Sequence, residues 1–531
     1  MAKFIFVTGG VLSGLGKGIT AASIGNILTA RGKKVFMMKF DQYFNVDAGT
    51  LNPAEHGECF VTDDGAETDL DLGHYERFTD QNLTRESSVM SGQIYQAIIE
   101  NERQGKYLGK TIQMIPHLTD EIKERINNAA KRSNADFVIV EIGGTVGDYE
   151  GLHFVEAIRQ MRRDKGIDST LYCHVGFFPW LATTEELKTK PMQNSIRDLN
   201  NFGIHPDIVF CRADYPIPAR CLDKISTFCN IDRDAVVPLE TLGNVYELPL
   251  LLEKFNVARV ISRKLKTPLG RRIDRSWIEL NKNIRSKKNK SVNIALVGKY
   301  MDMKDTYYSV TEALKSAAYK NHVKLNILWT DSELVERYGV DKYLKNTDGI
   351  VVPGGFGNRG IEGKIMAAKY ARENKVPYLG LCLGMQIAVI EFARHALKTK
   401  ACNSTEFDKN VKNPVIDIME HQKKISEKGG TMRLGAYPCV LSEDSKSLNL
   451  YGKKEVSERH RHRYEFNNDY REVLSKAGLL IAGTSPDNKL VEIIEHKDHP
   501  FFVASQFHPE FKSRPNRPHP LFDGFIKAAI K

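Results

Sequence analysis

A cysteine between two glycines, with a histidine and an acid far downstream, is the strongest chemical pattern in this sequence. The apolar run 376–381 has the composition of a β-strand. Cys382 stands at its end in Gly380-Leu381-Cys382-Leu383-Gly384, before a helical pattern. This is the arrangement of a nucleophile elbow, in which small neighbours permit a strained turn that exposes the central side chain. The N-terminus of the following helix favours the thiolate, which is the nucleophilic form.

His508 and Glu510 are the candidate partners of this thiol. His508 can take the thiol proton and Glu510 can orient the imidazole, as in triads of the Cys-His-acid type. The glycine loop 353–357 can supply the N–H of Gly355 to an oxyanion hole, and the N–H of Leu383 is the second donor. A single buried cysteine is more often an inert core residue, but the three motifs together indicate a triad enzyme.

A glycine-rich segment near the N-terminus is the second chemical pattern. It follows the strand-like run 4–8 and contains Gly14-Leu15-Gly16-Lys17-Gly18-Ile19, with a helical pattern from about Lys17. Backbone N–H groups, the positive helix end and the Lys17 ammonium would together bind phosphate oxygens; a plain tight turn is the alternative. The segment departs from a strict Walker A motif, because Gly18 replaces the hydroxyl that normally meets Mg²⁺.

Without that hydroxyl, carboxylates would have to hold the metal. Two places are suitable: the acid-rich run 63–73, and Glu141 at the carboxyl end of the strand-like run 137–140. Ligands of open parallel sheets bind outside the carboxyl ends of strands, and Mg²⁺ prefers oxygen ligands. Either acid taken alone could equally be a helix cap. The lysine-rich segment 188–193, with Lys224, would by itself be an exposed helix face, but such lysines also serve as point charges for a second polyphosphate.

The composition is that of a soluble globular protein. Hydrophobic residues make up 41% and charged residues 27% of the 531 residues, a length that predicts two to four domains at about 150 residues each. No apolar run approaches the ~18 residues of a membrane helix, and the N-terminal apolar stretch is too short for a signal peptide. The eight cysteines form no CxxC pair, which favours reduced thiols and a cytoplasmic location.

The formal charge of +10 is concentrated rather than spread. Residues 271–290 hold eight Lys or Arg against two acidic residues, with one aromatic side chain, Trp277. A solvated linker is the simplest interpretation, and subunit contacts or anionic ligands are the alternatives. The charge therefore gives no reason to expect binding to nucleic acid, and the hydropathy gives none to expect binding to a membrane.

Alternating strand-like and helical runs surround this segment and must position the chemical groups. Strand-like runs occur at 4–8, 34–40, 111–115, 137–142, 171–175 and 208–211, and again at 292–297, 325–329, 349–352 and 378–381. From about residue 430 the chain becomes richer in strands. Such alternation predicts parallel sheets covered on both faces. We therefore expect an α/β protein with two doubly wound, mostly parallel-sheet domains, 1–266 and 291–531, joined by a basic linker, 267–290.

Across essentially its whole length the chain resembles the cytidine triphosphate (CTP) synthase family. The resemblance rests on the triad motif, as in class I glutamine amidotransferases, and on four further strings, at 69–78, 141–148, 188–191 and 459–465. It implies a P-loop-like N-terminal amidoligase domain that uses MgATP to phosphorylate the 4-oxygen of UTP, so that ammonia can displace phosphate at C4 and give CTP. It also implies a C-terminal glutaminase that releases this ammonia into an internal passage, where the ammonia stays neutral.

The resemblance also assigns residues to ligands. For ATP it implies Gly14, Leu15, Gly16, Lys17, Gly18, Ile19, Lys39, Asp71 and Arg212, and for Mg²⁺ it implies Asp71 and Glu141. For UTP and the product CTP it implies Ser13, Lys188, Thr189, Lys190, Pro191, Met192, Gln193 and Lys224, with Asp148, Tyr149 and Glu150 at the inhibitory cytidine. For glutamine it implies Gly355, Leu383, Gly384, Met385, Gln386, Glu406 and Arg463, beside the catalytic Cys382, His508 and Glu510.

Regulation and assembly are a further implication of the resemblance. GTP is the expected allosteric activator of glutamine hydrolysis, with Arg433 in the lid segment concerned, and CTP is the expected inhibitor. The expected assembly is a homotetramer whose interfaces build the UTP site. Whether the tetramers form filaments stays open.

Four positions depart from the family pattern: Gln42 and Ala48, where Pro is usual, Glu240 in a segment of ATP contacts, and Tyr308, where Lys is common. They bear on affinity and regulation rather than on the chemistry. Two alternatives to a CTP synthase stay open at this stage. Another glutamine-dependent amidoligase, such as a cobyrinate-diamide synthase, would share the phosphate loop and the triad but lack the lysines at 188–193. A nucleotide-gated scaffold would have no need of the triad.

Overall fold

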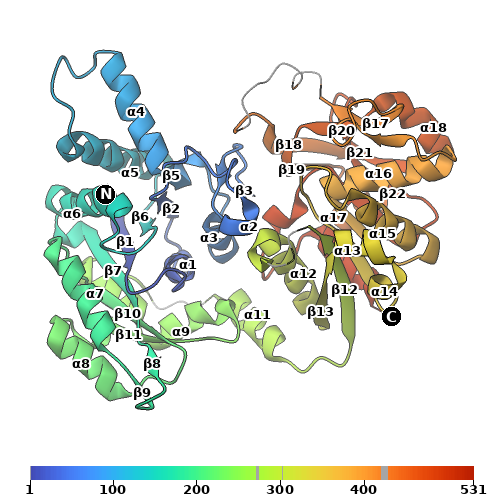
Figure 1. The fold of residues 1–531 in the computed structure, drawn as a ribbon. Helices are drawn as coiled ribbons and strands as arrows, with labels where there is room; N and C mark the ends of the chain where they lie inside the picture. The colour runs from blue at the N-terminus through green and yellow to red at the C-terminus, as the bar shows by residue number, and fades with distance from the viewer. Residues whose placement is uncertain are drawn as a thin grey trace. The chain divides into compact units, whose positions relative to one another are not determined.

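The computed structural model describes residues 2–270, 274–299, 301, 303–419, 422 and 429–530. The chain forms two compact units. The first comprises residues 1–47 and 71–281, and the second comprises residues 48–70 and 282–531. Figure 1 shows a sheet with helices on its faces in each unit.

The first unit is built on a seven-stranded sheet with the order β11-β10-β7-β1-β6-β2-β5. All neighbouring strands in it pair in parallel. The strands are β1 (Lys3–Gly9), β2 (Val35–Asp41), β5 (Ser88–Met90), β6 (Phe137–Ile142), β7 (Thr170–Phe177), β10 (Ile208–Ala213) and β11 (Val236–Glu240). Six consecutive residues of β1, from Phe4 to Gly9, are buried, because helices cover both faces of a parallel sheet.

One strand expected from the sequence is wrong. Residues 111–115 do not join the sheet, and the edge strand is β5 instead. Met114 and Ile115 are about half exposed, and Pro116 follows, which has no N–H to give to a strand ladder. The apolar composition of this run is therefore not matched by burial within the unit.

The second unit has a nine-stranded sheet with the order β13-β12-β14-β15-β23-β22-β21-β18-β19. The pairs from β13 to β23 are parallel, and the pairs beyond β23 that involve β22, β21, β18 and β19 are antiparallel. The strands are β12 (Ser291–Gly298), β13 (Lys324–Asp331), β14 (Gly349–Val352), β15 (Tyr378–Leu381), β18 (Arg433–Leu441), β19 (Glu455–His462), β21 (Leu479–Thr484), β22 (Val491–His496) and β23 (Phe502–Ser505). The expected α/β fold class is confirmed, but only the first sheet is parallel throughout, and the second is parallel from β13 to β23 alone.

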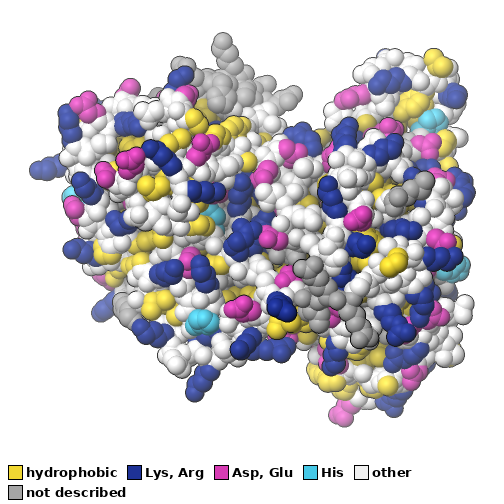
Figure 2. Space-filling view, turned by 180° about the vertical axis from the view of Figure 1, so that it is seen from behind, with side chains coloured by type: hydrophobic (Ala, Val, Ile, Leu, Met, Phe, Trp, Pro, Cys, Tyr) yellow, Lys and Arg dark blue, Asp and Glu magenta, His cyan; other side chains and the backbone are white. Residues whose placement is uncertain are grey.

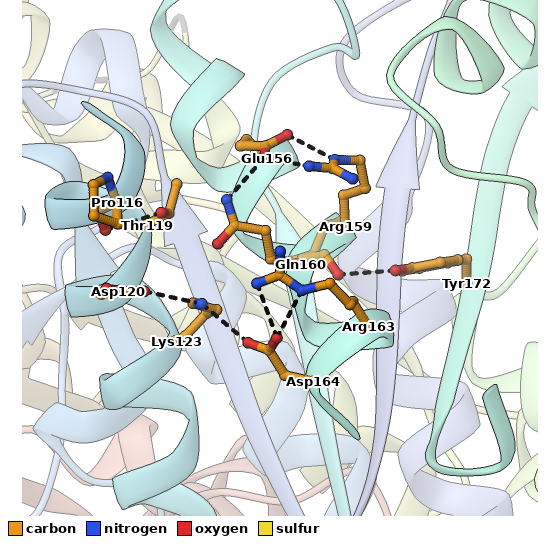
Figure 3. A network of polar contacts seen from close by, with 11 residues as sticks. Pro116, Thr119, Asp120, Lys123, Glu156, Arg159, Gln160, Arg163, Asp164 and Tyr172 are labelled. Atoms are coloured by element: carbon orange, nitrogen blue, oxygen red, sulfur yellow. Dashed lines mark hydrogen bonds and ion pairs between the residues drawn. The ribbon is translucent and has the colours of Figure 1, made fainter. Parts of the chain in front are cut away.

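Helices α5 (Thr119–Ser133) and α6 (Leu152–Lys165) lie against one face of the first sheet and are joined by polar contacts (Figure 3). Nζ of Lys123 in α5 lies 2.9 Å from Oδ1 of Asp120 and 3.0 Å from Oδ2 of Asp164 in α6. The hydroxyl of Tyr172 in β7 donates to Ile158 O at 2.8 Å. These contacts connect both helices to the strand layer beneath them.

The basic segment expected to link the domains is partly helical. Helix α11 (Arg275–Arg285) buries Trp277 and Asn281, and Nδ2 of Asn281 donates to Tyr246 O at 2.9 Å. Residues 271–273 lie outside the described residues. Lys and Arg side chains are interspersed with Asp and Glu over the face seen in Figure 2. In the part of the chain that the structure describes, no helix is long and apolar enough to cross a membrane.

Segment 48–70 is fastened to the second unit although it precedes most of the first unit in sequence. It carries α2 (Pro53–His56), β3 (Phe60–Val61) and β4 (Glu67–Thr68). Arg459 in β19 is fully buried; its Nε lies 2.5 Å from Oδ1 of Asp63, and its Nη1 donates to Val61 O at 3.1 Å. One buried guanidinium thus holds the end of β3 and the start of the turn that follows it.

We predict that Arg459→Ala destabilises the second unit by about 3 kcal/mol, because a buried ion pair loses one partner and a cavity replaces the guanidinium. Calorimetric unfolding measures this loss. Lys476→Ala is the control: its ion pair with Glu472 is exposed, with side-chain exposures of 74% and 81%, and its loss should change stability by less than about 0.5 kcal/mol. Equal effects of the two substitutions would contradict the role given to Arg459.

Candidate active sites

The thiol of Cys382 lies at a sharp turn between β15 and helix α16 (Leu383–Ala396). Cys382 has φ 52° and ψ −101°, a conformation that is strained for a residue with a side chain. Its N–H donates to Ser505 O in β23 at 2.7 Å. A Cβ on Gly384 would lie 2.0 Å from Val352 O, so only glycine fits after the turn.

His508 and Glu510 follow the neighbouring strand β23 and face this turn. Nδ1 of His508 lies 2.7 Å from Oε1 of Glu510. Cys382 and His508 both border Gly354, where a Cβ would lie 2.9 Å from Cε1 of His508 and 3.7 Å from Cβ of Cys382. Burial by itself lowers the pKa of His508, but Glu510 and Cys382 outweigh burial and raise the pKa to about 10. A protonated imidazole is therefore favoured beside the thiol.

The glycine loop after β14 borders the same turn. A Cβ on Gly355 would lie 3.5 Å from Cδ2 of Leu383, so the two residues expected to supply oxyanion donors are neighbours. Nζ of Lys299 donates to a loop carbonyl, that of residue 356, at 2.6 Å. The N–H of Gly357 donates to Oε1 of Glu406 at 2.8 Å. Side chains from outside the loop therefore hold its backbone in place.

The remaining residues expected at glutamine are brought to the same end of the sheet but differ in their contacts. Gln386 is buried, and its Nε2 donates to a backbone carbonyl, that of residue 464, at 3.0 Å. Arg463 donates to Oε1 of Gln422 at 2.7 Å. Met385 is fully buried in the core around α16, so its side chain does not face a ligand.

A cavity of about 140 Å³ lies beside Cys382 and His508. Its walls also include three residues of segment 48–70, Pro53, Glu58 and Cys59. Glu58 is fixed there, because its Oε2 accepts a hydrogen bond from the N–H of residue 309 at 2.8 Å. The space around the thiol is thus continuous with side chains that come from the N-terminal half of the sequence and fold into the second unit.

The phosphate loop of the first unit lies between β1 and helix α1 (Lys17–Thr29). Gly14 and Gly16 have φ of 71° and 83°, which turns the chain sharply before the helix begins. Ser13 and Gly14 are exposed, whereas Lys17 is buried and its Nζ donates to Gly144 O at 2.7 Å. Burial lowers the pKa of Lys17. The loop and the helix end have the form expected of a phosphate site.

Asp71 and Glu141 approach the start of this helix. A Cβ on Gly18 would lie 2.5 Å from Oδ1 of Asp71 and 3.2 Å from Oε2 of Glu141. Lys39 in β2 forms an ion pair with Asp71 and lies 3.5 Å from Oε1 of Glu141. Burial alone would raise the pKa of Asp71, but Lys39 and His74 help to lower it to about 2. Burial raises the pKa of Glu141.

These two carboxylates stand where a Walker hydroxyl would be, and they fit a Mg²⁺ ion that takes its other ligands from phosphate and water. Among the described residues, no group of three or more His, Cys, Asp or Glu could hold a metal by itself.

Two of the lysines expected at UTP, Lys188 and Lys224, lie near Glu186. Lys188 forms an ion pair with it, and Lys224 in α8 (Ala219–Cys229) is close enough to help lower the pKa of Glu186, after the dominant hydrogen bond from Lys188. Lys190 and Pro191 begin helix α7 (Lys190–Asn201). The N-terminus of this helix carries a partial positive charge. Nε2 of Gln193 donates to Oγ1 of Thr189 at 3.1 Å, whereas Met192 is fully buried and packs on Gly176.

Two of the departures from the family pattern contact residues expected at nucleotides. Nε2 of Gln42 donates to Oδ2 of Asp148 at 3.3 Å. Arg212 donates to Glu240 O at 3.3 Å, and burial lowers its pKa. Tyr149 and Glu150 are exposed beside Asp148. Of the other two departures, Ala48 is buried in segment 48–70 and Tyr308 begins α12 (Tyr308–Lys320).

Sequence reasoning missed several residues at the thiol. Nε2 of Gln506 donates to Sγ of Cys382 at 3.7 Å, and Sγ of Cys382 lies at the same distance from Arg461 O. The side chain of Arg461 lines the cavity with Glu58 and Cys59. Gln506 could have been found from its place two residues before the histidine. Nothing in the sequence near Glu58 or Cys59 points to a thiol more than 300 residues away.

Comparisons with known proteins match two successive parts of the sequence to two families. Residues 3–267 match the family described as CTP synthase N-terminus, and residues 302–528 match glutamine amidotransferase class-I. The chain is 56% identical to a CTP synthase of Caldanaerobacter subterraneus subsp. tengcongensis, over 100% of this chain and 98% of the relative. It is also 56% identical to a CTP synthase of Carboxydothermus hydrogenoformans, over 100% and 99%. The solved glutaminase domain of Trypanosoma brucei CTPS with bound acivicin is 43% identical over 45% of this chain and 94% of that chain, with a TM-score of 0.43.

We predict that Glu510→Gln slows alkylation of Cys382 by iodoacetamide at pH 7 by about ten-fold. Glu510 is the largest of the interactions that raise the pKa of His508, so its loss lowers that pKa, weakens the imidazolium and leaves less thiolate. Mass-spectrometric rates of labelling at this residue give the measurement. Glu443→Gln, at an exposed ion pair with Lys454, is the control. An unchanged rate in Glu510→Gln would contradict the positive charge assigned to His508.

Proposed function

The chain belongs to the CTP synthase family, and from this membership we propose that it makes CTP from UTP and ATP with ammonia taken from glutamine by the Cys382 triad. One structural observation supports the proposal independently of family membership. The cavity beside the nucleophile is walled by Pro53, Glu58 and Cys59, which lie within the part of the chain that matches the CTP synthase N-terminus. Ammonia released at the thiol would therefore emerge beside a segment of the N-terminal part of the sequence that folds into the second unit.

We propose that the second unit is the glutaminase. The Cys382 thiolate attacks the amide carbon of glutamine, and the N–H groups of Gly355 and Leu383 stabilise the oxyanion. His508 gives its proton to the leaving ammonia and then takes one from water, which hydrolyses the thioester. Glu510 orients the imidazole throughout. Glu406, Gln386 and Arg463 would hold glutamine, with Gly384 and Met385 contributing backbone only.

We propose that the first unit is the amidoligase. The ATP phosphates would lie on the loop from Gly14 to Ile19, with Lys17 as a positive charge beside them and Lys39 near the transferred phosphoryl group. Asp71 and Glu141 would hold Mg²⁺, which when bound neutralises phosphate charge. Arg212 would lie near the adenine. Transfer of the γ-phosphoryl group to O4 of UTP turns that oxygen into a leaving group, which ammonia displaces at C4.

The lysines around Glu186 support UTP as the acceptor, because a triphosphate needs several point charges. Lys188, Lys190 and Lys224 supply them, with Ser13, Thr189 and Gln193 as hydrogen-bonding partners. Asp148, Tyr149 and Glu150 would contact the cytidine of inhibitory CTP. Gln42 contacts Asp148, which supports an effect of this departure on inhibition by CTP.

GTP activation, tetramer formation and a cytoplasmic location are part of the same proposal. Half-exposed Met114 and Ile115 and the 89% exposed Leu108 support contact between copies of the first unit. Arg433 forms a buried ion pair with Glu492 at 2.7 Å, so a GTP contact by its side chain would require that pair to open.

We predict that Cys382→Ala abolishes glutamine-dependent CTP formation and leaves ammonia-dependent formation at the wild-type rate, because only the first needs the thiol. Product chromatography with UTP, MgATP and either nitrogen source makes the measurement. Cys439→Ala, which removes a different buried thiol of the same unit, controls for loss of structure. Loss of both activities in a folded Cys382→Ala protein would show that the two reactions are not separable as proposed.

We predict that Gly18→Ala reduces CTP formation with both nitrogen sources by about a hundred-fold, because the added Cβ, 2.5 Å from Oδ1 of Asp71, must displace the carboxylate that holds Mg²⁺. Gly270→Ala is a matched control, since a Cβ there meets no atom within 4 Å. Glutamine hydrolysis without nucleotides gives a second readout that should not change. Normal ammonia-dependent synthesis in Gly18→Ala would refute the metal assignment.

A further inference from the structure

Lys364 is a buried lysine beside the glycine loop that the proposed reaction has not used. It is the fourth residue of helix α15 (Ile361–Asn374), and its exposed fraction is 0%. Its Nζ has no hydrogen-bond partner within the described structure. Buried ammonium groups are almost always paired or hydrogen-bonded, since their desolvation is costly.

Its position on the helix makes this lysine still less favourable. The N-terminus of a helix carries a partial positive charge, which disfavours a cation in the first turn. Ile365, Ala367 and Ala368 around it are core residues, so a Met or Leu would satisfy both the helix and the core. A residue that breaks two local rules without a local compensation indicates a functional role.

The ammonium faces the oxyanion loop. A Cβ built on Gly355 would lie 3.9 Å from Nζ of Lys364 and 3.5 Å from Cδ2 of Leu383. Gly355 therefore lies next to both the lysine and the side chain of Leu383. In the described structure the ammonium has no hydrogen-bond partner. Its positive charge therefore acts on the neighbouring loop.

The charged groups around Lys364 come from three other elements. They are Lys299 at the end of β12, Glu406 after β16 (Cys402–Ser404), and Cys382 at the turn. Nζ of Lys299 donates hydrogen bonds to the carbonyl oxygens of residues 356 and 357, and Glu406 accepts a hydrogen bond from the N–H of Gly357. Burial and Lys299 lower the pKa of Lys364 to about 7, and Cys382 and Glu406 act in the opposite direction. An anion formed at the turn would favour the charged form.

We propose that Lys364 is a positioning residue of the glutaminase, whose buried positive charge acts through the Gly355 loop to stabilise the anions formed at Cys382. These anions are the thiolate and the oxyanion of the tetrahedral intermediate. The inference rests on the proposed glutaminase function. Electrostatic stabilisation of this kind acts mainly on the transition state, so it raises kcat more than it lowers KM.

The test compares Lys364→Met with wild type in the full-length protein. Removal of a directly donating group from an oxyanion hole costs about 10²–10³ in kcat; for a charge that acts through the loop we expect a fall of about ten-fold in kcat for glutamine hydrolysis. KM for glutamine should stay within about two-fold, and ammonia-dependent CTP formation should not change. The melting temperature should equal or exceed that of wild type, because the substitution removes an unpaired buried charge.

Two further variants separate charge from shape. Lys364→Gln keeps a polar end without charge and should lose as much kcat as Lys364→Met. Lys369→Met removes an exposed lysine from the same helix and should behave as wild type. Wild-type kcat in either Lys364 variant, or a fall in kcat matched by a lower melting temperature, would overturn the inference. Absence of glutamine hydrolysis by the wild-type protein would instead overturn the proposed function and the inference with it.

Discussion

Charge held out of water is the constraint on which both units depend. In the second unit, the imidazolium of His508 is buried and is stabilised by Glu510 and Cys382. In the first unit, Lys39 lies between Asp71 and Glu141. Isolated charges in these places would cost more than a fold can compensate. Each charge is therefore tolerated only because another element of the fold brings its counter-charge into reach.

The parallel sheets make this possible. The carboxyl ends of parallel strands meet at one edge, so groups that are far apart in sequence collect there. Cys382, the Gly355 loop and His508 follow three neighbouring strands, β15, β14 and β23. The phosphate loop likewise follows β1, and Glu141 lies at the carboxyl end of the neighbouring strand β6. The fold thus brings the carboxyl ends of these strands together, and the residues at those ends are the reactive groups.

Local patterns predicted the turns and the fold class well, because a Gly-x-Cys-x-Gly turn or a glycine-rich loop is decided within a few residues. Long-range packing could not be predicted in the same way. The apolar run 111–115 lacks burial in the unit and forms no strand. The place of segment 48–70 depends on Arg459, almost 400 residues away. Lys364 looks like an ordinary helix-surface lysine in the sequence, and only its burial reveals it.

We propose that ammonia from the triad reaches UTP without mixing with solvent. The most direct test supplies the wild-type enzyme with UTP, MgATP and glutamine labelled with ¹⁵N in the amide, together with an equimolar amount of unlabelled ammonium chloride. Mass spectrometry of the product then gives the source of the nitrogen. If ammonia is transferred internally, CTP should carry nearly the full ¹⁵N enrichment of the glutamine amide. Enrichment diluted in proportion to the unlabelled ammonia would contradict it.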